Sequence, residues 1–218
     1  MRIVIAGGHG KIAQILERHL AERGDDVVGL IRNPDHAADL RDAGAEPVTF
    51  DLEHGSADEL ATILSGADAV VFAAGAGPGS GAARKDTVDR GGAVLLADAA
   101  ERAGVNRYVM VSSMGAAKGG AGIEDEVFAA YQEAKKAADE DLMSRDLAWT
   151  ILRPGGLTDE PGTGLVTMAP ETGRGSIPRE DVARTIVAVL DDPATDGLVA
   201  ELIGGSQRIA IALAELTD

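Results

Sequence analysis

The regular alternation of strand-like and helix-like segments is the feature that most limits how this chain can fold. Short apolar runs alternate with longer segments whose apolar residues recur at helical spacing. The strand candidates are RIVIAGG, DDVVGLIR, EPVTFDL, DAVVFAAG, VNRYVMVSS and LAWTILRP. Strands that alternate with helices form βαβ units, and right-handed crossovers place the helices on both faces of a parallel sheet. The sequence therefore predicts a doubly wound α/β fold with a mostly parallel sheet.

Several helix ends carry recognisable signals. Ser56 followed by Glu59 three residues later forms a capping box at the start of one helix. Gly44 and Gly104 follow the last periodic residues of two others, where a glycine commonly ends a helix. Residues 86–103 read as one long helix that closes at Gly104.

The pattern changes after Pro154. A loop rich in Gly, Pro, Asp and Thr is followed by a short strand candidate (LVTM), a turn-rich piece, a helix (REDVARTIVAVLDD), a strand (LVAELIG) and a terminal helix. The sequence contains no internal repeat and no separable linker. We therefore expect one domain over 1–218, with 155–218 as a small appendage on the substrate side.

Composition and charge exclude several classes of function. The 36 acidic and 20 basic residues give a net charge of −16, which repels a nucleic-acid backbone. The absence of cysteine excludes disulfides, thiolate catalysis and Cys-zinc sites, and the four histidines lack ligand spacing, so we expect no metal site. The N-terminal MRIVIAGG has no signal-peptide layout, and no apolar run is long enough to span a bilayer. We expect a soluble cytoplasmic protein with neither a nucleic-acid nor a membrane partner.

A glycine-rich loop joins the first strand to the first helix. Gly7 allows a sharp turn, and Gly10 allows the backbone to approach a pyrophosphate, which then meets the free N–H groups of the helix. Ala13 stands where the helix packs closely on the strand. The alternative is an ordinary tight turn between strand and helix. If the loop binds a dinucleotide, its contacts are Gly7, Gly8, His9, Gly10, Lys11 and Ile12.

The end of the second strand bears on the choice of cofactor. Arg32 stands there without an acidic residue, and a planar guanidinium suits a ribose 2′-phosphate. We therefore favour NADP(H) over NAD(H), the alternative being that Arg32 is a surface residue. A carboxylate at the end of the third strand could accept from the adenine amino group, and small residues after the fourth leave room for the cofactor. These further contacts are Asp51, Leu52, Ala73, Ala74 and Gly75.

Taken together, these motifs resemble the short-chain dehydrogenase/reductase superfamily. The similarity is to its atypical NAD(P)H-binding, epimerase-like members, which have a Rossmann fold. The stretches that carry it cover nearly the whole chain: GGHGKIA, IRNP, FDL, FAAGAG, VDRGGAVLLADAA, YVMVSSMG, YQEAK, WTILRPGGLTDEPG and IPREDVA.

The resemblance implies a set of site residues. Tyr131 would be the general acid/base, and Lys135 would bind the nicotinamide ribose and lower the tyrosine pKa. Ser113, with Ser112 as the alternative, would orient the substrate carbonyl or hydroxyl. The remaining cofactor contacts implied at the nicotinamide end are Val111, Ser112, Lys135, Arg153, Pro154 and Gly155.

Helix geometry agrees with a paired role for Tyr131 and Lys135. Residues four apart lie on one face of a helix. An apolar stripe points Tyr131 towards the sheet and leaves Lys135 at the stripe's edge; its members are Val127, Tyr131, Ala134, Ala138 and Leu142. A nearby ammonium favours the phenolate of a tyrosine that otherwise titrates near pH ~10. The alternative is a core tyrosine beside a solvated lysine.

Two functions remain open at this stage. One is an NADP(H)-dependent oxidoreductase or sugar-epimerase-like enzyme, which passes hydride to or from a small carbonyl or alcohol substrate. The other is a non-enzymatic NADP(H)-binding redox sensor or regulator. The short stretch after Arg153 favours a small substrate. The oligomeric state is open, and a homodimer is one option.

Overall fold

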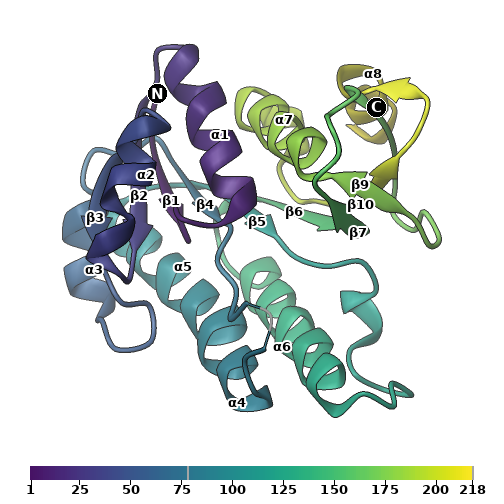
Figure 1. The fold of residues 1–218 in the computed structure, drawn as a ribbon, viewed down its shortest axis with the longest axis horizontal. Coiled ribbons are helices and arrows are strands. Elements are labelled where there is room, and N and C mark those ends of the chain that lie inside the picture. The colour runs from purple at the N-terminus through teal and green to yellow at the C-terminus, as the bar shows by residue number, and fades with distance from the viewer. Residues whose placement is uncertain (78, 218) are drawn as a thin grey trace.

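A nine-stranded, mostly parallel sheet with helices on both faces forms the body of the computed structural model (Figure 1). The structure describes residues 1–77 and 79–217. The strand order is β11-β8-β10-β6-β5-β4-β1-β2-β3, and β7 and β9 form a separate parallel pair. The strands are β1 Arg2–Ala6, β2 Asp26–Ile31, β3 Glu46–Thr49, β4 Ala69–Phe72, β5 Arg107–Val111, β6 Ala148–Pro154, β7 Gly156–Thr158, β8 Leu165–Ala169, β9 Ser176–Pro178, β10 Leu198–Gly204 and β11 Gln207–Arg208.

The order of the strands reverses at β1. The chain runs outward through β2 and β3 on one side of β1, and through β4, β5 and β6 on the other. All these neighbours pair in parallel, as does β10 beside β6, whereas β8 pairs antiparallel with both β10 and β11. The predicted doubly wound α/β fold is confirmed. A reversal of this kind leaves a crevice at the carboxyl ends of the central strands, where such folds bind ligands.

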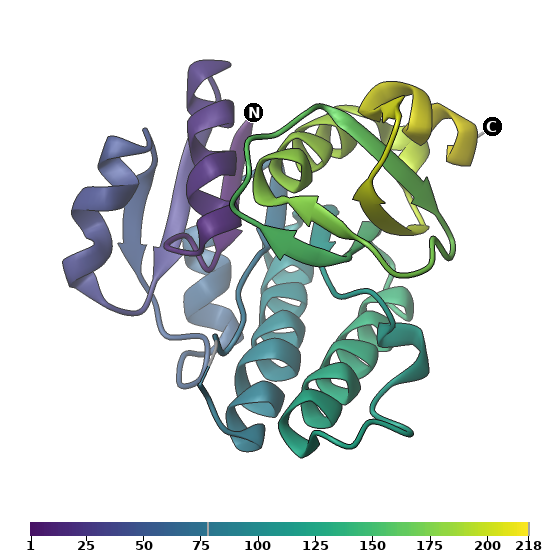
Figure 2. The same cartoon turned by 45° about the vertical axis from the view of Figure 1, so that its right-hand side comes forward.

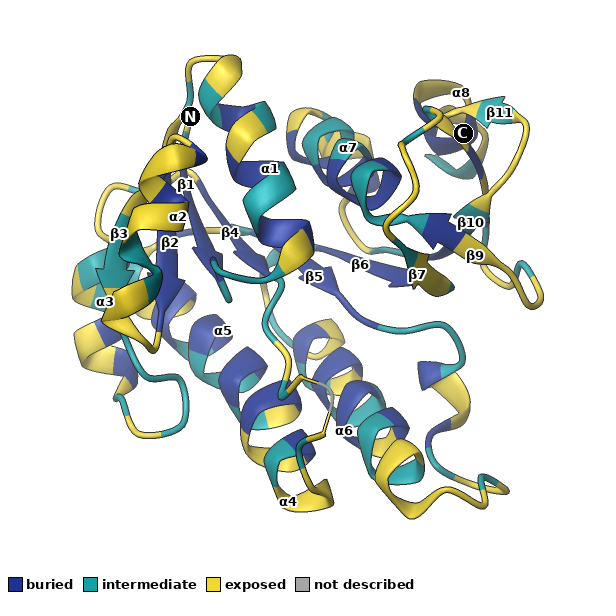
Figure 3. Cartoon of the chain, in the orientation of Figure 1, coloured by how far each residue is buried: buried dark blue, intermediate teal, exposed yellow. Residues whose placement is uncertain are grey.

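Helices bury apolar residues against both faces of the sheet. α1, α2, α7 and α8 pack on one face, and α3, α5 and α6 on the other, with the buried strands between them (Figures 1 and 3). None of the helices within 1–77 and 79–217 has the length and apolar character needed to cross a bilayer. The α-helices are α1 Lys11–Glu22, α2 Ala37–Asp42, α3 Ala57–Leu64, α4 Ala82–Arg84, α5 Gly92–Ala103, α6 Glu126–Met143, α7 Arg179–Asp191 and α8 Ile209–Thr217.

The predicted helix ends are present. The Ser56 hydroxyl accepts the Glu59 N–H, and the Glu59 carboxylate accepts the Ser56 N–H, which completes the capping box of α3. Gly44 and Gly104 follow α2 and α5 with φ of +85° and +71°, a conformation that ends a helix.

The predicted single helix over 86–103 is wrong. A short α4 leads into a π-helix, Lys85–Gly91, and α5 begins only at Gly92. The wider turn of the π-helix places Lys85, Val88 and Asp89 on its buried side. The spacing of apolar residues did not reveal this change, because the regular helical period of α5 was extended backwards over the π-helix that precedes it.

Residues 155–218 add strands to the main sheet. β10 is hydrogen-bonded to β6 as the next parallel strand, and β8 and β11 continue beyond it. Figure 2 shows these residues, green to yellow and including the β7–β9 pair, gathered on one side of the molecule. Two side-chain contacts, His19 with Glu180 and Lys11 with Asp159, tie α1 to this part of the chain.

Candidate functional site

Three adjoining hollows lie at the carboxyl ends of the central strands. We name each hollow after one residue that lines it. The His9 hollow has a volume of about 200 Å³, the Arg32 hollow about 170 Å³ and the Tyr131 hollow about 390 Å³. All three share Ala74 and Gly75, which follow β4. The three hollows therefore adjoin one another around the end of β4, at the point where the strand order reverses, and we refer to them together as the crevice.

The glycine loop forms the middle of this crevice. Gly7 has φ +86°, and a Cβ on it would lie 2.6 Å from the Ala74 Cα. Gly10 is the N-cap of α1 and provides no side-chain acceptor. The first N–H groups of α1 therefore remain available to an anion. The loop backbone and the helix end together form the glycine cradle, and a side chain at Gly7 would collide with the Ala74 backbone.

The structure brings only part of the predicted loop to the crevice. Gly8 packs on β2: its N–H donates to the Leu30 carbonyl, and a Cβ would lie 2.9 Å from the Gly29 Cα. Of the described residues, the three hollows are lined by Gly7, His9, Gly10 and Ile12 from this loop, but not by Gly8 or Lys11. The Lys11 ammonium lies 2.6 Å from an Asp159 carboxylate oxygen, in a separate hollow between α1 and α7.

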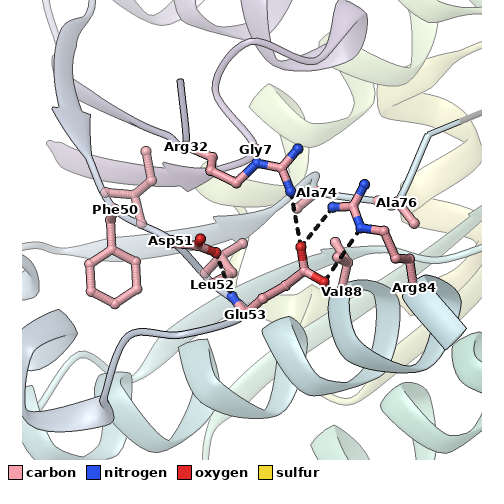
Figure 4. Close-up of a pocket in the computed structure, with 12 residues that line it drawn as sticks. Gly7, Arg32, Phe50, Asp51, Leu52, Glu53, Ala74, Ala76, Arg84 and Val88 are labelled. Atoms are coloured by element: carbon pink, nitrogen blue, oxygen red, sulfur yellow. Dashed lines mark hydrogen bonds and ion pairs between the residues drawn. The ribbon is translucent and has the colours of Figure 1, made fainter. Parts of the chain in front are cut away.

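Arg32 and Arg84 converge on one carboxylate in the Arg32 hollow (Figure 4). Arg32 Nη1 lies 2.9 Å and Arg84 Nη2 2.7 Å from Glu53 Oε2, and the Thr87 hydroxyl donates to Oε1. Hydrogen bonds from Arg84 and Thr87 lower the pKa of Glu53 to about 2. The sequence did not predict Glu53 and Arg84 as site residues. Arg84 lies at the end of the short helix α4, and no sequence motif marks that segment.

The end of the third strand lines the same hollow. Asp51 and Leu52 are both present there, as predicted. The Asp51 carboxylate already accepts the Glu53 N–H at 2.9 Å and lies 3.0 Å from His54 Nδ1. It is therefore part of a local turn as well as of the wall.

Tyr131 and Lys135 meet in the Tyr131 hollow. The Lys135 ammonium lies 5.9 Å from the Tyr131 ring centroid and donates to the Val111 carbonyl at 3.1 Å. Lys135 is only 3% exposed, so the alternative of a solvated lysine is wrong. Its charge is compensated by the buried Asp89, whose Oδ1 is 3.5 Å away.

The prediction that Val127 belongs to the apolar stripe that faces the sheet is wrong. Val127 is exposed at the first turn of α6, whereas Ala134, Ala138 and Leu142 are buried. Tyr131 lies between the two, half-buried, with its ring stacked on exposed Phe128 at 6.0 Å. The tyrosine therefore stands where the helix passes from solvent to core.

The two serines after β5 differ in their surroundings, although both line the Tyr131 hollow. The buried Ser112 hydroxyl donates to Asp139 at 2.9 Å. Ser113 is half-buried, and its hydroxyl accepts a 3.3 Å hydrogen bond from Gln132. Ser113 is therefore the better placed of the two to meet a ligand.

Arg153 lies beneath the hollow, while Pro154 and Gly155 line it. Arg153 is part of β6, and its Nε donates to the buried Asp139 at 2.8 Å. Side chains alternate along a strand, so Arg153 shares the α6 face with Ile151 and meets Asp139 there. The Arg153 side chain is thus paired with Asp139, and Arg153 is not among the described residues that line the hollow. Burial raises the pKa of Asp139 despite Ser112 and Arg153 beside it.

Lys85 and Asp89 are site residues that sequence reasoning missed. The π-helix brings both into the Tyr131 hollow. Asp89 accepts the Ala76 N–H and pairs with Lys135, and Lys85 donates to the Gly77 carbonyl at 3.0 Å. No local sequence signal marks them, because a regular helix would give them another orientation.

Glu17 lies buried beneath the glycine loop. Its side chain is fully enclosed, and neither carboxylate oxygen has a hydrogen-bond partner among the described residues. A Cβ on Gly8 or on Gly29 would lie 2.9 or 2.6 Å from Glu17 Oε1. Burial raises the pKa of Glu17 to about 8, so the carboxyl is protonated at neutral pH.

A family model described as NAD(P)H-binding matches residues 7–193. Bacillus subtilis YhfK, described as an uncharacterized sugar epimerase, is 38% identical over 99% of this chain and 100% of its own length. The resemblance inferred from the motifs is thereby confirmed.

Solved structures show the same architecture. A Bacillus halodurans protein, provisionally described as an NAD-dependent epimerase/dehydratase, is 36% identical with a TM-score of 0.92, and the match covers 99% of this chain and 100% of that one. ChuY, described as an anaerobillin reductase from Escherichia coli O157:H7, is 25% identical with a TM-score of 0.78, over 95% and 99% of the two chains.

Proposed function

Since this chain belongs to the NAD(P)H-binding family, we propose that it is an NADP(H)-dependent oxidoreductase or epimerase-like enzyme acting on a small carbonyl or alcohol. The observation that carries the proposal is that the hollows of the crevice adjoin one another. The glycine cradle adjoins the hollow that contains Ser113, Tyr131 and Lys135. A dinucleotide in the crevice would present its nicotinamide to these three side chains.

The residues present fit such a cofactor. The N–H groups at the start of α1 suit the pyrophosphate, and Asp51, Leu52 and Arg32 suit the adenosine half. The Tyr131 hollow has room for the nicotinamide beside Pro154 and Gly155. The bound cofactor supplies or accepts the hydride at its nicotinamide ring.

Tyr131 and the side chains around it transfer the proton to or from the substrate oxygen. The Tyr131 hydroxyl gives a proton to the developing alkoxide, or takes one from an alcohol. The Lys135 ammonium, fixed by Asp89 and the Val111 carbonyl, lies 5.9 Å from the centroid of the Tyr131 ring. The Ser113 hydroxyl orients the substrate oxygen. Asp139 joins Ser112 to Arg153 and so fixes the end of β5 beside β6.

Turnover tests this function directly. Purified protein with NADPH and a panel of small aldehydes and ketones should consume NADPH, followed by its absorbance. Tight NADPH binding without consumption on any member of the panel would instead favour a redox sensor.

Preference for NADP(H) is proposed from the two arginines in the Arg32 hollow. A 2′-phosphate could accept hydrogen bonds from both guanidiniums, in competition with the Glu53 carboxylate that now joins them. Arg32→Gln should therefore weaken NADPH binding by about tenfold or more, the effect of losing one charge-assisted hydrogen bond. Glu53→Gln should act in the opposite direction, because it removes the competitor. Both are measured by titration of nicotinamide fluorescence.

NADH provides the internal control, since it lacks the 2′-phosphate, and its affinity should change by less than about twofold in Arg32→Gln. Arg41→Gln, at an exposed position on α2, controls for a general loss of positive charge. Equal weakening of NADPH and NADH in Arg32→Gln would contradict the assignment of Arg32 to the phosphate.

A further inference from the structure

Lys85 is a buried cation in the Tyr131 hollow without a carboxylate partner. It is 9% exposed, and among the described residues no carboxylate oxygen lies within 4.0 Å of its ammonium. The two other buried cationic side chains, Lys135 and Arg153, are paired with Asp89 and Asp139. A buried charge is costly unless it is paired. Lys85 therefore lacks the kind of counterion that its two neighbours have.

The groups that do contact Lys85 compensate only part of its charge. Its ammonium donates one hydrogen bond, to the Gly77 carbonyl, and lies 5.4 Å from the Tyr131 ring centroid. A carbonyl and an aromatic ring are neutral, and an ammonium has three donors. Asp89, one π-helical turn along, is occupied by Lys135 and the Ala76 N–H. Lys85 can thus bind an anion that enters the hollow.

From this geometry we infer that Lys85 binds a carboxylate of the substrate, next to the carbonyl or carbinol carbon that faces Tyr131. The inference rests on the proposed function and adds the class of substrate. One ammonium matches one negative charge, and the net charge of −16 disfavours anions of higher charge. Lys85 is then a specificity residue, and its ammonium lies beside the Tyr131 ring at 5.4 Å, as that of Lys135 does at 5.9 Å.

Two exposed apolar side chains indicate the rest of the substrate. Leu157 lines the hollow with 38% of its surface exposed, and Phe128, 48% exposed, stacks on Tyr131. Large apolar groups left in solvent around a cavity commonly contact an apolar ligand. The substrate is accordingly an apolar or aromatic oxo acid, or its hydroxy acid counterpart.

The test compares two ligands that differ only in the carboxylate. Benzoylformate and acetophenone share a phenyl ketone, and a methyl replaces the carboxylate in acetophenone. Calorimetric titration of each ligand into apo and NADPH-loaded protein measures binding without turnover. The variants are Lys85→Met, which removes the charge, and Lys85→Arg, which keeps it. Lys118→Met, at an exposed lysine outside the hollow, is the matched control.

Wild-type protein should bind benzoylformate more tightly than acetophenone. Lys85→Met should weaken benzoylformate by about tenfold or more, with acetophenone and NADPH unchanged, and Lys85→Arg should restore most of the difference. Equal or undetectable binding of both ketones to wild type, or an unchanged benzoylformate affinity in Lys85→Met, would overturn the inference. Lys85-dependent binding of benzoylformate to a protein that does not bind NADPH would support it while refuting the proposed function.

Discussion

Tyr131→Phe is expected to lower turnover by about 10²–10⁴-fold, the usual contribution of a general acid or base, while the Kd for NADPH changes by less than about twofold. The reason is geometric. The phenol ring lies 5.9 Å from the ammonium of Lys135 and lines the same hollow as Ser113. Removal of the hydroxyl deletes the proton donor but leaves the glycine cradle and the Arg32 hollow intact. Steady-state rates with NADPH and an accepted carbonyl substrate, together with a fluorescence titration, measure both quantities.

Tyr108→Phe is the matched control, since it is the same chemical change at the chain's other tyrosine. The Tyr108 hydroxyl is buried in the core and donates to the Ala93 carbonyl, away from the crevice. This variant should lose stability but retain its turnover number. Activity in Tyr131→Phe equal to that of wild type would contradict the acid/base role and favour the regulatory alternative.

Glu17→Gln is expected to remove a strong pH dependence of stability. The pKa of Glu17 is about 8 in the folded protein, whereas the ordinary value of a glutamate side chain, which applies to the unfolded chain, is 4.5. Between these values the folded state retains a proton that the unfolded state has released, so raising the pH favours unfolding. The group's contribution is fully present below about pH 4.5 and falls by about 1.4 kcal/mol per pH unit towards pH 8. Between pH 5 and 8 the wild type should lose roughly 3–4 kcal/mol through this group.

Denaturant unfolding at pH 5, 6, 7 and 8 measures this loss. Glutamine keeps the size of the protonated carboxyl and cannot ionise, so Glu17→Gln should be more stable than wild type at pH 8 by a few kcal/mol. Glu22→Gln, at an exposed position in the same helix, should follow the wild-type curve. Parallel curves for wild type and Glu17→Gln would show that Glu17 ionises without cost in the folded protein.

Local patterns predicted the fold well because the determinants are local. The alternating periodicities specify the strands and helices of the βαβ units, and the Ser56–Glu59 pair and Gly104 specify ends that depend on a few neighbouring residues. The crevice also follows from the chain order, since its position is set where the strands reverse at β1. Tyr131, Lys135 and Ser113 meet there because each stands on an element that the pattern identifies.

Charge compensation could not be predicted in this way, because it depends on contacts between distant segments. Lys135 is buried because Asp89 arrives from a π-helix, and the apolar period does not distinguish that helix from an ordinary one. Arg153 is withdrawn from the crevice by Asp139, which is 14 residues away in sequence and on another element. Arg32 and Arg84 both donate hydrogen bonds to the Glu53 carboxylate, and no sequence motif marks Arg84.

Paired titrations of the apo-protein with NADPH and NADH, followed by nicotinamide fluorescence, test the central claim most directly. The Arg32 hollow and the Tyr131 hollow adjoin at Ala74, Gly75 and Ala76, so both cofactors should bind across them. NADPH should bind more tightly, by about tenfold or more, through its 2′-phosphate. Failure of both to bind at any accessible concentration would contradict the assignment of the crevice, and with it the roles proposed for Tyr131 and Lys135.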